Sequence, residues 1–167
     1  MNTFILPGYS SSNKEWLEQC STSISVDGFI RPVYWDHWKD EKEIFDAKEK
    51  ANLIARHSKG DKVNIIAKSI GTIVASLVIN QIPDQINKVI FCGIPLNDIN
   101  SLEKKIILDS IAKIDKAKII CLQNNKDPHG DESQVKDFLS DSIEIKIKEA
   151  DNHSYNYFKD FNDFLNS

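Results

Sequence analysis

The stretch Val63-Asn64-Ile65-Ile66-Ala67-Lys68-Ser69-Ile70-Gly71-Thr72-Ile73-Val74-Ala75 decides the fold. Its first part is an apolar run rich in β-branched residues, typical of a buried strand, and a helical pattern of small and apolar residues begins directly after Ser69. Such a passage from strand to helix is typical of a serine held on a tight turn. Ala67 and Gly71, two positions before and after the serine, are small enough to avoid steric collision there.

The same alternation of strand and helix runs through the whole chain. β-Branched apolar runs predict strands at Thr3–Leu6, Ile30–Trp35, Val63–Ala67, Lys88–Cys92, Lys118–Leu122 and Ile143–Ile147. Helical periodicity is found at Asn13–Thr22, Glu41–His57, Ile70–Ile82, Ser101–Ala112, Glu132–Leu139 and Tyr155–Leu165. Because parallel strands need crossover connections, which helices supply, this pattern predicts an α/β fold. We expect a three-layer αβα sandwich around a mostly parallel sheet of about six strands.

Length and composition indicate one domain. The chain has 167 residues, of which 41% are hydrophobic, enough for a core that needs neither metal nor disulfide. Since no Pro/Gly/Ser-rich linker divides the chain, we expect residues 1–167 to form a single domain. The 21 Lys and Arg residues against 25 Asp and Glu residues give a net charge of −4, which disfavours a nucleic-acid partner. Cys20, Cys92 and Cys121 are widely spaced and indicate neither a disulfide framework nor a zinc site.

The sequence also bears on cellular location. Lys68 interrupts the longest apolar run, residues 63–82, so no uncharged segment is long enough to cross a bilayer. The first residues, Met1–Leu6, run into Pro7-Gly8 without the basic start and cleavage site of a secretion signal. We therefore expect a cytoplasmic protein with no membrane span. The sequence sets no oligomeric state.

The turn at Ser69 resembles the nucleophile elbow of the α/β-hydrolase family. That elbow usually reads G-x-S-x-G, and this chain reads Ala67-Lys68-Ser69-Ile70-Gly71, with alanine for the first glycine. The resemblance implies a small hydrolase without a cap, with Ser69 as the nucleophile. A bland alternative is that Ser69 is only an N-cap for the following helix.

Two later loops resemble the family's acid and histidine loops and keep its order of serine, acid and histidine. Asp127 lies in the polar turn after the fifth expected strand, and His153 lies in the loop between the sixth strand and the last helix. The resemblance implies that His153 takes the Ser69 proton while Asp127 orients the imidazole and stabilises its cation. Asp98, after the fourth expected strand, is the alternative acid.

Other residues are expected around this site. The loop after the first strand, Leu6-Pro7-Gly8-Tyr9-Ser10-Ser11, matches the family's oxyanion loop, although Pro7 stands where many members have histidine. The resemblance implies that the backbone amides of Tyr9 and Ile70 form the oxyanion hole. Possible pocket residues are Ser10, Trp35, His37, Trp38 and Lys68. Lys68 either attracts an acidic substrate or is a lysine with a solvated head, and His37 is alternatively a surface residue.

These features predict a serine hydrolase that cleaves a carboxylic ester or thioester of a small molecule through an acyl-enzyme. No phosphate loop, dinucleotide motif or H-E-x-x-H zinc motif is present, so we expect no cofactor and no metal. The alternative is a catalytically inactive α/β-hydrolase-fold module that binds a ligand or a protein. Reactivity of Ser69 discriminates the two, because a retired nucleophile need not be activated.

Overall fold

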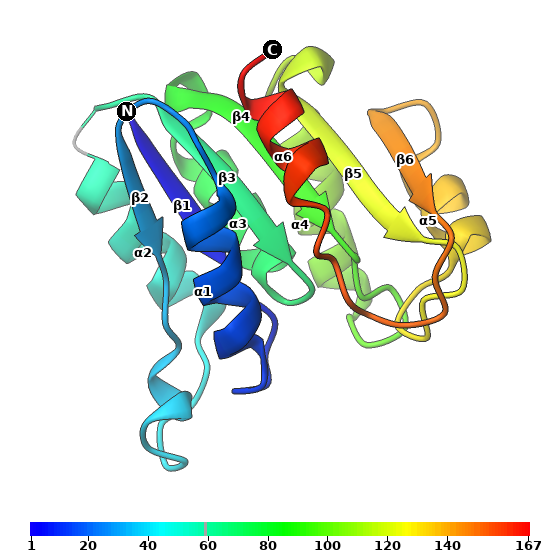
Figure 1. Cartoon of the computed structure of the whole chain (residues 1–167), viewed down its shortest axis with the longest axis horizontal. Coiled ribbons are helices and arrows are strands. Elements are labelled where there is room, and N and C mark those ends of the chain that lie inside the picture. Colours follow the sequence, from blue (N-terminus) through cyan, green and yellow to red (C-terminus); the bar gives the residue numbers. More distant parts are fainter. Residues whose placement is uncertain (59) are drawn as a thin grey trace.

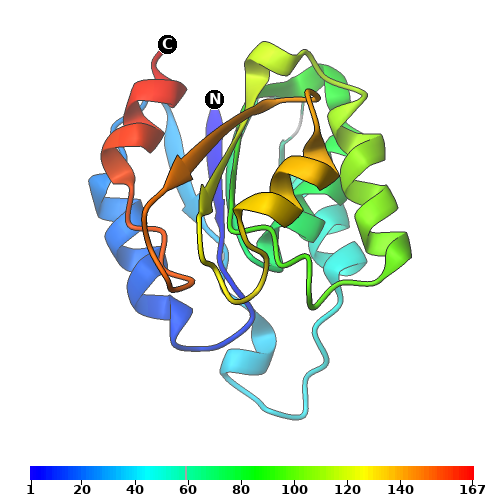
Figure 2. The same ribbon diagram turned by 90° about the vertical axis from the view of Figure 1, so that its right-hand side faces the viewer.

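The computed structural model describes residues 1–58 and 60–167. Within them one sheet of six parallel strands lies between two layers of helices (Figures 1 and 2). The strands are β1 (Asn2–Leu6), β2 (Phe29–Pro32), β3 (Val63–Lys68), β4 (Ile86–Cys92), β5 (Ile119–Asn124) and β6 (Glu144–Lys148). The α-helices are α1 (Asn13–Ser23), α2 (Ala47–Ser58), α3 (Gly71–Gln81), α4 (Ser101–Ile111), α5 (Glu132–Leu139) and α6 (Phe158–Leu165). The predicted three-layer α/β fold is confirmed.

The two faces of the sheet carry separate cores. Helices α1 and α6 cover one face, and α2, α3, α4 and α5 cover the other (Figure 2). Side chains of β3 alternate between them: Ile65 and Ala67 face α2 to α5, and Ile66 faces α1 and α6. Lys68 continues the alternation from Ile66, and its ammonium lies 5.5 Å from the centre of the Trp16 ring of α1.

The strand order is β2-β1-β3-β4-β5-β6. The chain adds β2 on one side of β1 and then adds β3 to β6 on the other side, so the order of connection switches between β1 and β3. In open parallel sheets, ligands bind beyond the carboxyl ends of the strands at such a switch. The loops after β1 and β3 begin at this point, and those after β5 and β6 leave the same edge of the sheet (Figure 1). The fold therefore brings segments distant in sequence to one edge.

Three expected element boundaries were wrong. The helix expected at 41–57 begins at Ala47, because the Asp46 carboxylate accepts hydrogen bonds from the amides of Lys48 and Glu49 at 2.8 and 3.0 Å. Ile44, inside the expected helix, is 89% exposed. Residues 41–46 belong instead to the long connection between β2 and α2.

The strand expected at 30–35 ends at Pro32, and the Trp35 side chain turns into the core, where its indole N–H donates to the Gly8 carbonyl at 2.9 Å. The helix expected at 155–165 begins at Phe158. Tyr155 lies outside it because its hydroxyl is bonded to the Asp127 carboxylate at the carboxyl edge of the sheet. In both places a tertiary hydrogen bond overrides the local periodicity.

Across the described ranges, 1–58 and 60–167, there is no helix with the length and apolarity needed to cross a membrane.

Candidate active site

Ser69 joins β3 to α3 through a left-handed backbone conformation, with φ of 54°. Residues other than glycine adopt this conformation at an energetic cost, and it is found where a turn is dictated by its surroundings. The Ser69 amide is anchored to the Cys92 carbonyl of β4 at 2.9 Å. Gly71 is required by packing, because a Cβ there would lie 2.4 Å from the Leu6 carbonyl oxygen. The elbow is therefore wedged tightly between β1 and β4.

Asp127 and His153 form a closely bonded pair. The His153 Nδ1 atom lies 2.6 Å from Asp127 Oδ2, and the Asp127 side chain is fully buried behind the imidazole. Because an ionised carboxylate can only accept, Nδ1 carries the proton and donates it. The other ring nitrogen, Nε2, is then left as the basic one.

The Asp127 carboxylate is held ionised by its neighbours. Burial alone would raise its pKa, but hydrogen bonds from His153, the Tyr155 hydroxyl and the His129 amide outweigh burial and hold the pKa below its usual value. The hydrogen bond that the His129 amide donates to Asp127 Oδ1 measures 2.8 Å. The tyrosine hydroxyl is itself fixed, because it accepts the amide of Asn124 at 3.1 Å.

The His153 ring fits against Gly93, which follows β4. A Cβ at Gly93 would approach the ring carbon Cε1 of His153 to 2.9 Å and the Tyr155 ring to 2.4 Å. Gly93 also has φ of 59°, so a side chain there is disfavoured both by these contacts and by the backbone conformation. Among the residues that the structure describes, the buried Nε2 of His153 has no hydrogen-bond partner.

Ser69 and His153 share the wall of one cavity of about 370 Å³, which we call the serine cavity. It is lined by Tyr9, Ser10, Asn13, Ser69, Ile70, Pro95, Asp98, Ile99, His129 and His153. Tyr9 and Ile70, whose amides are the expected oxyanion donors, thus line the same cavity as the serine. Neither amide donates to another group within the described residues.

The loop that carries the Tyr9 amide is held from behind. His37 Nε2 lies 2.8 Å from the Tyr9 carbonyl oxygen, and the Trp38 indole donates to the same oxygen at 2.6 Å. Trp35 binds the preceding carbonyl, that of Gly8, at 2.9 Å. These three aromatic residues were expected as pocket lining. They lie outside the serine cavity, and their contacts instead fix the loop.

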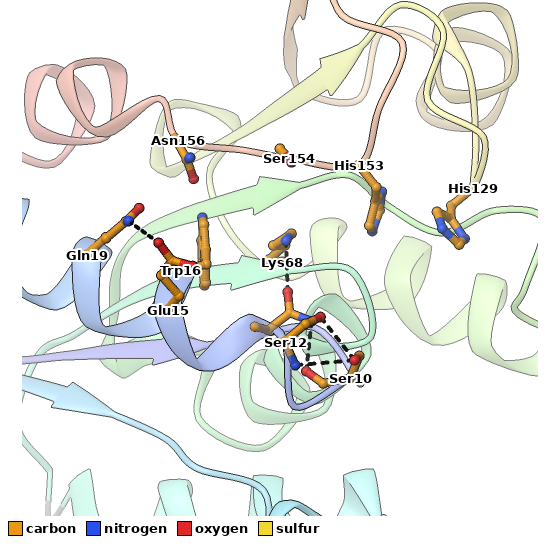
Figure 3. Close-up of a pocket in the computed structure, with 11 residues that line it drawn as sticks. Ser10, Ser12, Glu15, Trp16, Gln19, Lys68, His129, His153, Ser154 and Asn156 are labelled. Carbon is orange, nitrogen blue, oxygen red and sulfur yellow. Dashed lines mark hydrogen bonds between the residues drawn. The ribbon is translucent and has the colours of Figure 1, made fainter.

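A second cavity, of about 450 Å³, adjoins the first (Figure 3). This lysine cavity is lined by Ser10, Ser12, Asn13, Glu15, Trp16, Gln19, Lys68, His129, His153, Ser154 and Asn156. Lys68 is only 8% exposed, and its ammonium donates to Asn13 Oδ1 at 2.8 Å. Ser10, Asn13, His129 and His153 line both cavities.

The alternative acid, Asp98, pairs with a different histidine. Its Oδ2 lies 2.5 Å from His129 Nδ1, and both side chains are about half exposed. The His129 and His153 rings lie 4.4 Å apart, but the carboxylate bonded to His153 is that of Asp127. Over residues 1–58 and 60–167, no group of three or more His, Cys, Asp or Glu side chains could hold a metal ion.

Sequence reasoning missed several residues that build this site. Tyr155 holds Asp127, and Asn124 donates to the carbonyls of Asn152 and Ser154 at 2.8 and 3.0 Å, which fixes the histidine loop. The missed signals were a polar residue at the end of an apolar strand and a tyrosine just after the histidine. Gly93, directly after a strand, was a comparable signal.

Comparisons with known proteins identify the family to which this fold belongs. Residues 39–163 match the model of the family described as "Alpha/beta hydrolase domain". A YdeN-like hydrolase from Pectobacterium atrosepticum is similar in structure, with a TM-score of 0.68 and 14% identity over 99% of this chain and 90% of that one. Est1E from Butyrivibrio proteoclasticus, solved with ferulic acid bound, has a TM-score of 0.67 and 11% identity over 98% and 86% of the two chains.

A monoacylglycerol lipase from Paleococcus ferrophilus is also similar, with a TM-score of 0.63 and 10% identity over 98% of this chain and 93% of that one. No curated protein sequence matches the chain. The structural likeness extends over nearly all of this chain, and the family model covers most of it. Sequence match, strand order and turn geometry together establish that the chain belongs to the alpha/beta hydrolase family.

Proposed function

We propose that this protein is a serine hydrolase that cleaves a carboxylic ester or thioester of a small molecule. The observation that carries the proposal is the Asp127–His153 pair: the Nε2 atom of His153 has no partner among the described residues, and His153 lines the same cavity as Ser69. A serine on a strained turn beside such a base is the arrangement that acyl transfer needs.

The mechanism uses each group in turn. His153 Nε2 takes the proton from Ser69 Oγ as the oxygen attacks the carbonyl carbon, and Asp127 stabilises the resulting imidazolium. The amides of Tyr9 and Ile70 bind the oxyanion of the tetrahedral intermediate. His153 then gives its proton to the leaving alcohol or thiol, and an acyl group remains on Ser69. Water, deprotonated by His153, releases the acid and restores the serine.

The proposal is tested with a fluorophosphonate probe, which reacts with activated serines whatever their substrate. Wild type, Ser69→Ala, His153→Ala and the exposed control Ser133→Ala are incubated with the probe and measured by intact mass. We expect one adduct on wild type and on Ser133→Ala, and none on the other two. A panel of esters and thioesters of graded acyl length then defines the substrate. Absence of an adduct on folded wild type would reject the proposal.

Ligand binding without turnover is the second candidate. It is favoured by one observation: His153 Nε2 accepts no hydrogen bond from Ser69 or from any other described residue. In unliganded hydrolases this bond is often long and tightens only when substrate binds. An unlabelled but folded wild type whose thermal midpoint rises with small carboxylic esters would support the binding role.

A further inference from the structure

Lys68 is a buried cation with no carboxylate in salt-bridge contact among the described residues. Its side chain is 8% exposed, and within the described residues no carboxylate lies within 4 Å of its ammonium. An ammonium has three N–H donors, of which one is bonded to Asn13 Oδ1. A buried charge is costly unless it is paired. The ammonium therefore has both the free donors and the electrostatic need for an anion.

The surroundings of the ammonium are suited to a small polar group. The ammonium lies 5.5 Å from the centre of the Trp16 ring, and Ser10 and Ser12, whose hydroxyls are bonded to each other at 3.0 Å, line the same cavity (Figure 3). Glu15 is the opposing charge in this cavity, but it is exposed and accepts from Gln19 at 3.0 Å. Burial lowers the pKa of Lys68, and the buried Asp127 nearby partly offsets this.

The placement of the two cavities assigns the two halves of a substrate. Ser69 and the amide-bearing residues Tyr9 and Ile70 line the serine cavity, so the acyl carbon and its oxyanion lie there. The leaving atom must reach His153 Nε2 to receive its proton. Because His153 also lines the lysine cavity, a leaving group at this histidine has access to the cavity that contains Lys68.

We propose that the lysine cavity binds the leaving group of the substrate and that Lys68 recognises an anionic substituent, a carboxylate or a phosphate, on that group. The inference rests on the proposed hydrolase function. It narrows the substrates to esters or thioesters whose alcohol or thiol carries a carboxylate or a phosphate. In the step concerned, the acyl–oxygen or acyl–sulfur bond breaks, the acyl group forms a bond to Ser69 Oγ, and the leaving atom takes the proton from His153.

The test compares two butyrate esters of similar size, one of 4-hydroxybenzoate and one of 4-hydroxybenzamide. Wild type should have a higher kcat/KM for the anionic ester, after correction for the alkaline hydrolysis rate of each. In Lys68→Met the ratio of the two kcat/KM values should fall about tenfold, the size of one charge-assisted hydrogen bond. Lys14→Met removes the same charge from an exposed neighbour that lines neither cavity, and its ratio should equal that of wild type.

Two further arms locate and identify the anion. Phenyl hydrogen succinate, whose charge is on the acyl half, should show no preference over phenyl butyrate. Benzoate or phenyl phosphate should inhibit wild type more strongly than benzamide, and the stronger inhibitor identifies the anion. These wild-type measurements also decide the matter if Lys68→Met fails to fold by circular dichroism.

The outcomes separate the two proposals. Equal wild-type rates for both butyrates, or a preference carried by the acyl half, would overturn the leaving-group assignment while leaving the hydrolase intact. A ratio unchanged in folded Lys68→Met would overturn the role of Lys68. If neither ester is cleaved and Ser69 takes no fluorophosphonate, the proposed hydrolase function itself fails.

Discussion

Single residues in this site work against local preference. Ser69 is held in a left-handed conformation, and Asp127 is buried as an ion. Each has a cost of order 1 kcal/mol or more that the surrounding structure must offset. Substitutions at these positions should therefore separate stability from activity.

The backbone of Ser69 leads to a first prediction. Ser69→Gly should unfold with a free energy about 1 kcal/mol higher than that of Ser69→Ala, because glycine adopts the left-handed conformation without steric cost. Neither variant should be labelled by fluorophosphonate. Urea denaturation of the two variants measures the difference. Equal free energies of unfolding would contradict a strained turn.

Asp127 links the site to pH. Its pKa is lower in the folded protein than in the unfolded chain, so it contributes stability at pH above the unfolded value, about 3.9, and loses it as pH falls through the folded value. Asp127→Asn should remove this dependence and flatten the acid side of the stability curve. The variant should also lose about 10³- to 10⁴-fold in kcat.

Both effects of Asp127→Asn are measurable, by urea unfolding at pH 3 to 6 and by ester hydrolysis at neutral pH. Asp151→Asn, an exposed residue in the histidine loop, is the matched control and should behave as wild type. If Asp127→Asn keeps the kcat of wild type, Asp127 is not the acid of the triad, and Asp98 is the first alternative to test.

Tyr155 is a positioning residue rather than a catalytic one. Tyr155→Phe removes the donor to Asp127 and the acceptor of the Asn124 amide, and should lower stability by about 1–3 kcal/mol. Since the carboxylate is then less well fixed, kcat should fall about tenfold with KM little changed. Tyr157→Phe also removes a hydroxyl bonded to Asn124 but leaves Asp127 untouched, and should have the smaller effect on kcat.

At the scale of elements, the connection between β2 and α2 supports the loop that carries the Tyr9 amide, a proposed oxyanion donor. Trp38→Phe removes the indole bond to the Tyr9 carbonyl and keeps an aromatic ring, so the adjoining Tyr9 amide should become less well placed. We expect kcat to fall about tenfold, because loss of a whole oxyanion donor costs about 10²- to 10³-fold. KM should change little.

The matched control for Trp38→Phe is Tyr34→Phe, in the same segment. Tyr34 is exposed and packs edge-on against Trp38, at a ring separation of 6.4 Å, without bonding the loop. Steady-state kinetics on one ester compares kcat and KM of the two variants. Equal losses in both variants would mean that the segment acts through general packing and not through the Tyr9 carbonyl.

Element-scale patterns were readable from the sequence wherever burial follows a simple period. Strand β3 and the turn at Ser69 were predictable because an apolar run, small residues and a helix start coincide within a few positions. Asp127 and His153 were predictable from their order and from the strands before them. Whether Asp127 or Asp98 bonds the histidine depended on a tertiary contact that periodicity does not encode.

What the sequence could not show is set by contacts between distant segments. The start of α2 depends on a capping carboxylate at Asp46, and the role of Trp35 depends on a carbonyl of the first loop. The burial of Lys68 required knowing that β3 alternation directs it onto Trp16 of α1. Such facts follow from the arrangement of layers, which local patterns do not determine.

At the scale of the whole molecule, we propose that both cores belong to one cooperative domain. Trp16 packs in the core beneath α1 and α6, and Trp35 in the core beneath α2 to α5. A variant retaining only Trp16 and one retaining only Trp35, each with phenylalanine at the other tryptophan positions, report the two layers separately. In each, fluorescence should give the same urea midpoint as circular dichroism. Different urea midpoints for the two variants would mean that the two cores unfold as separate units.

The spread of the site along the chain also bears on how the protein is made. Domains begin to fold while the chain is being synthesised, from the amino terminus onward. Ser69 is translated early, with β3, whereas Asp127 and His153 follow β5 and β6. A ribosome-bound intermediate that contains β1 to β4 would carry Ser69 without His153, its proposed base. In the proposed mechanism, Ser69 of the nascent chain would therefore be unreactive until β6 has joined the sheet. Newly made protein would gain a reactive serine only when its fold is complete.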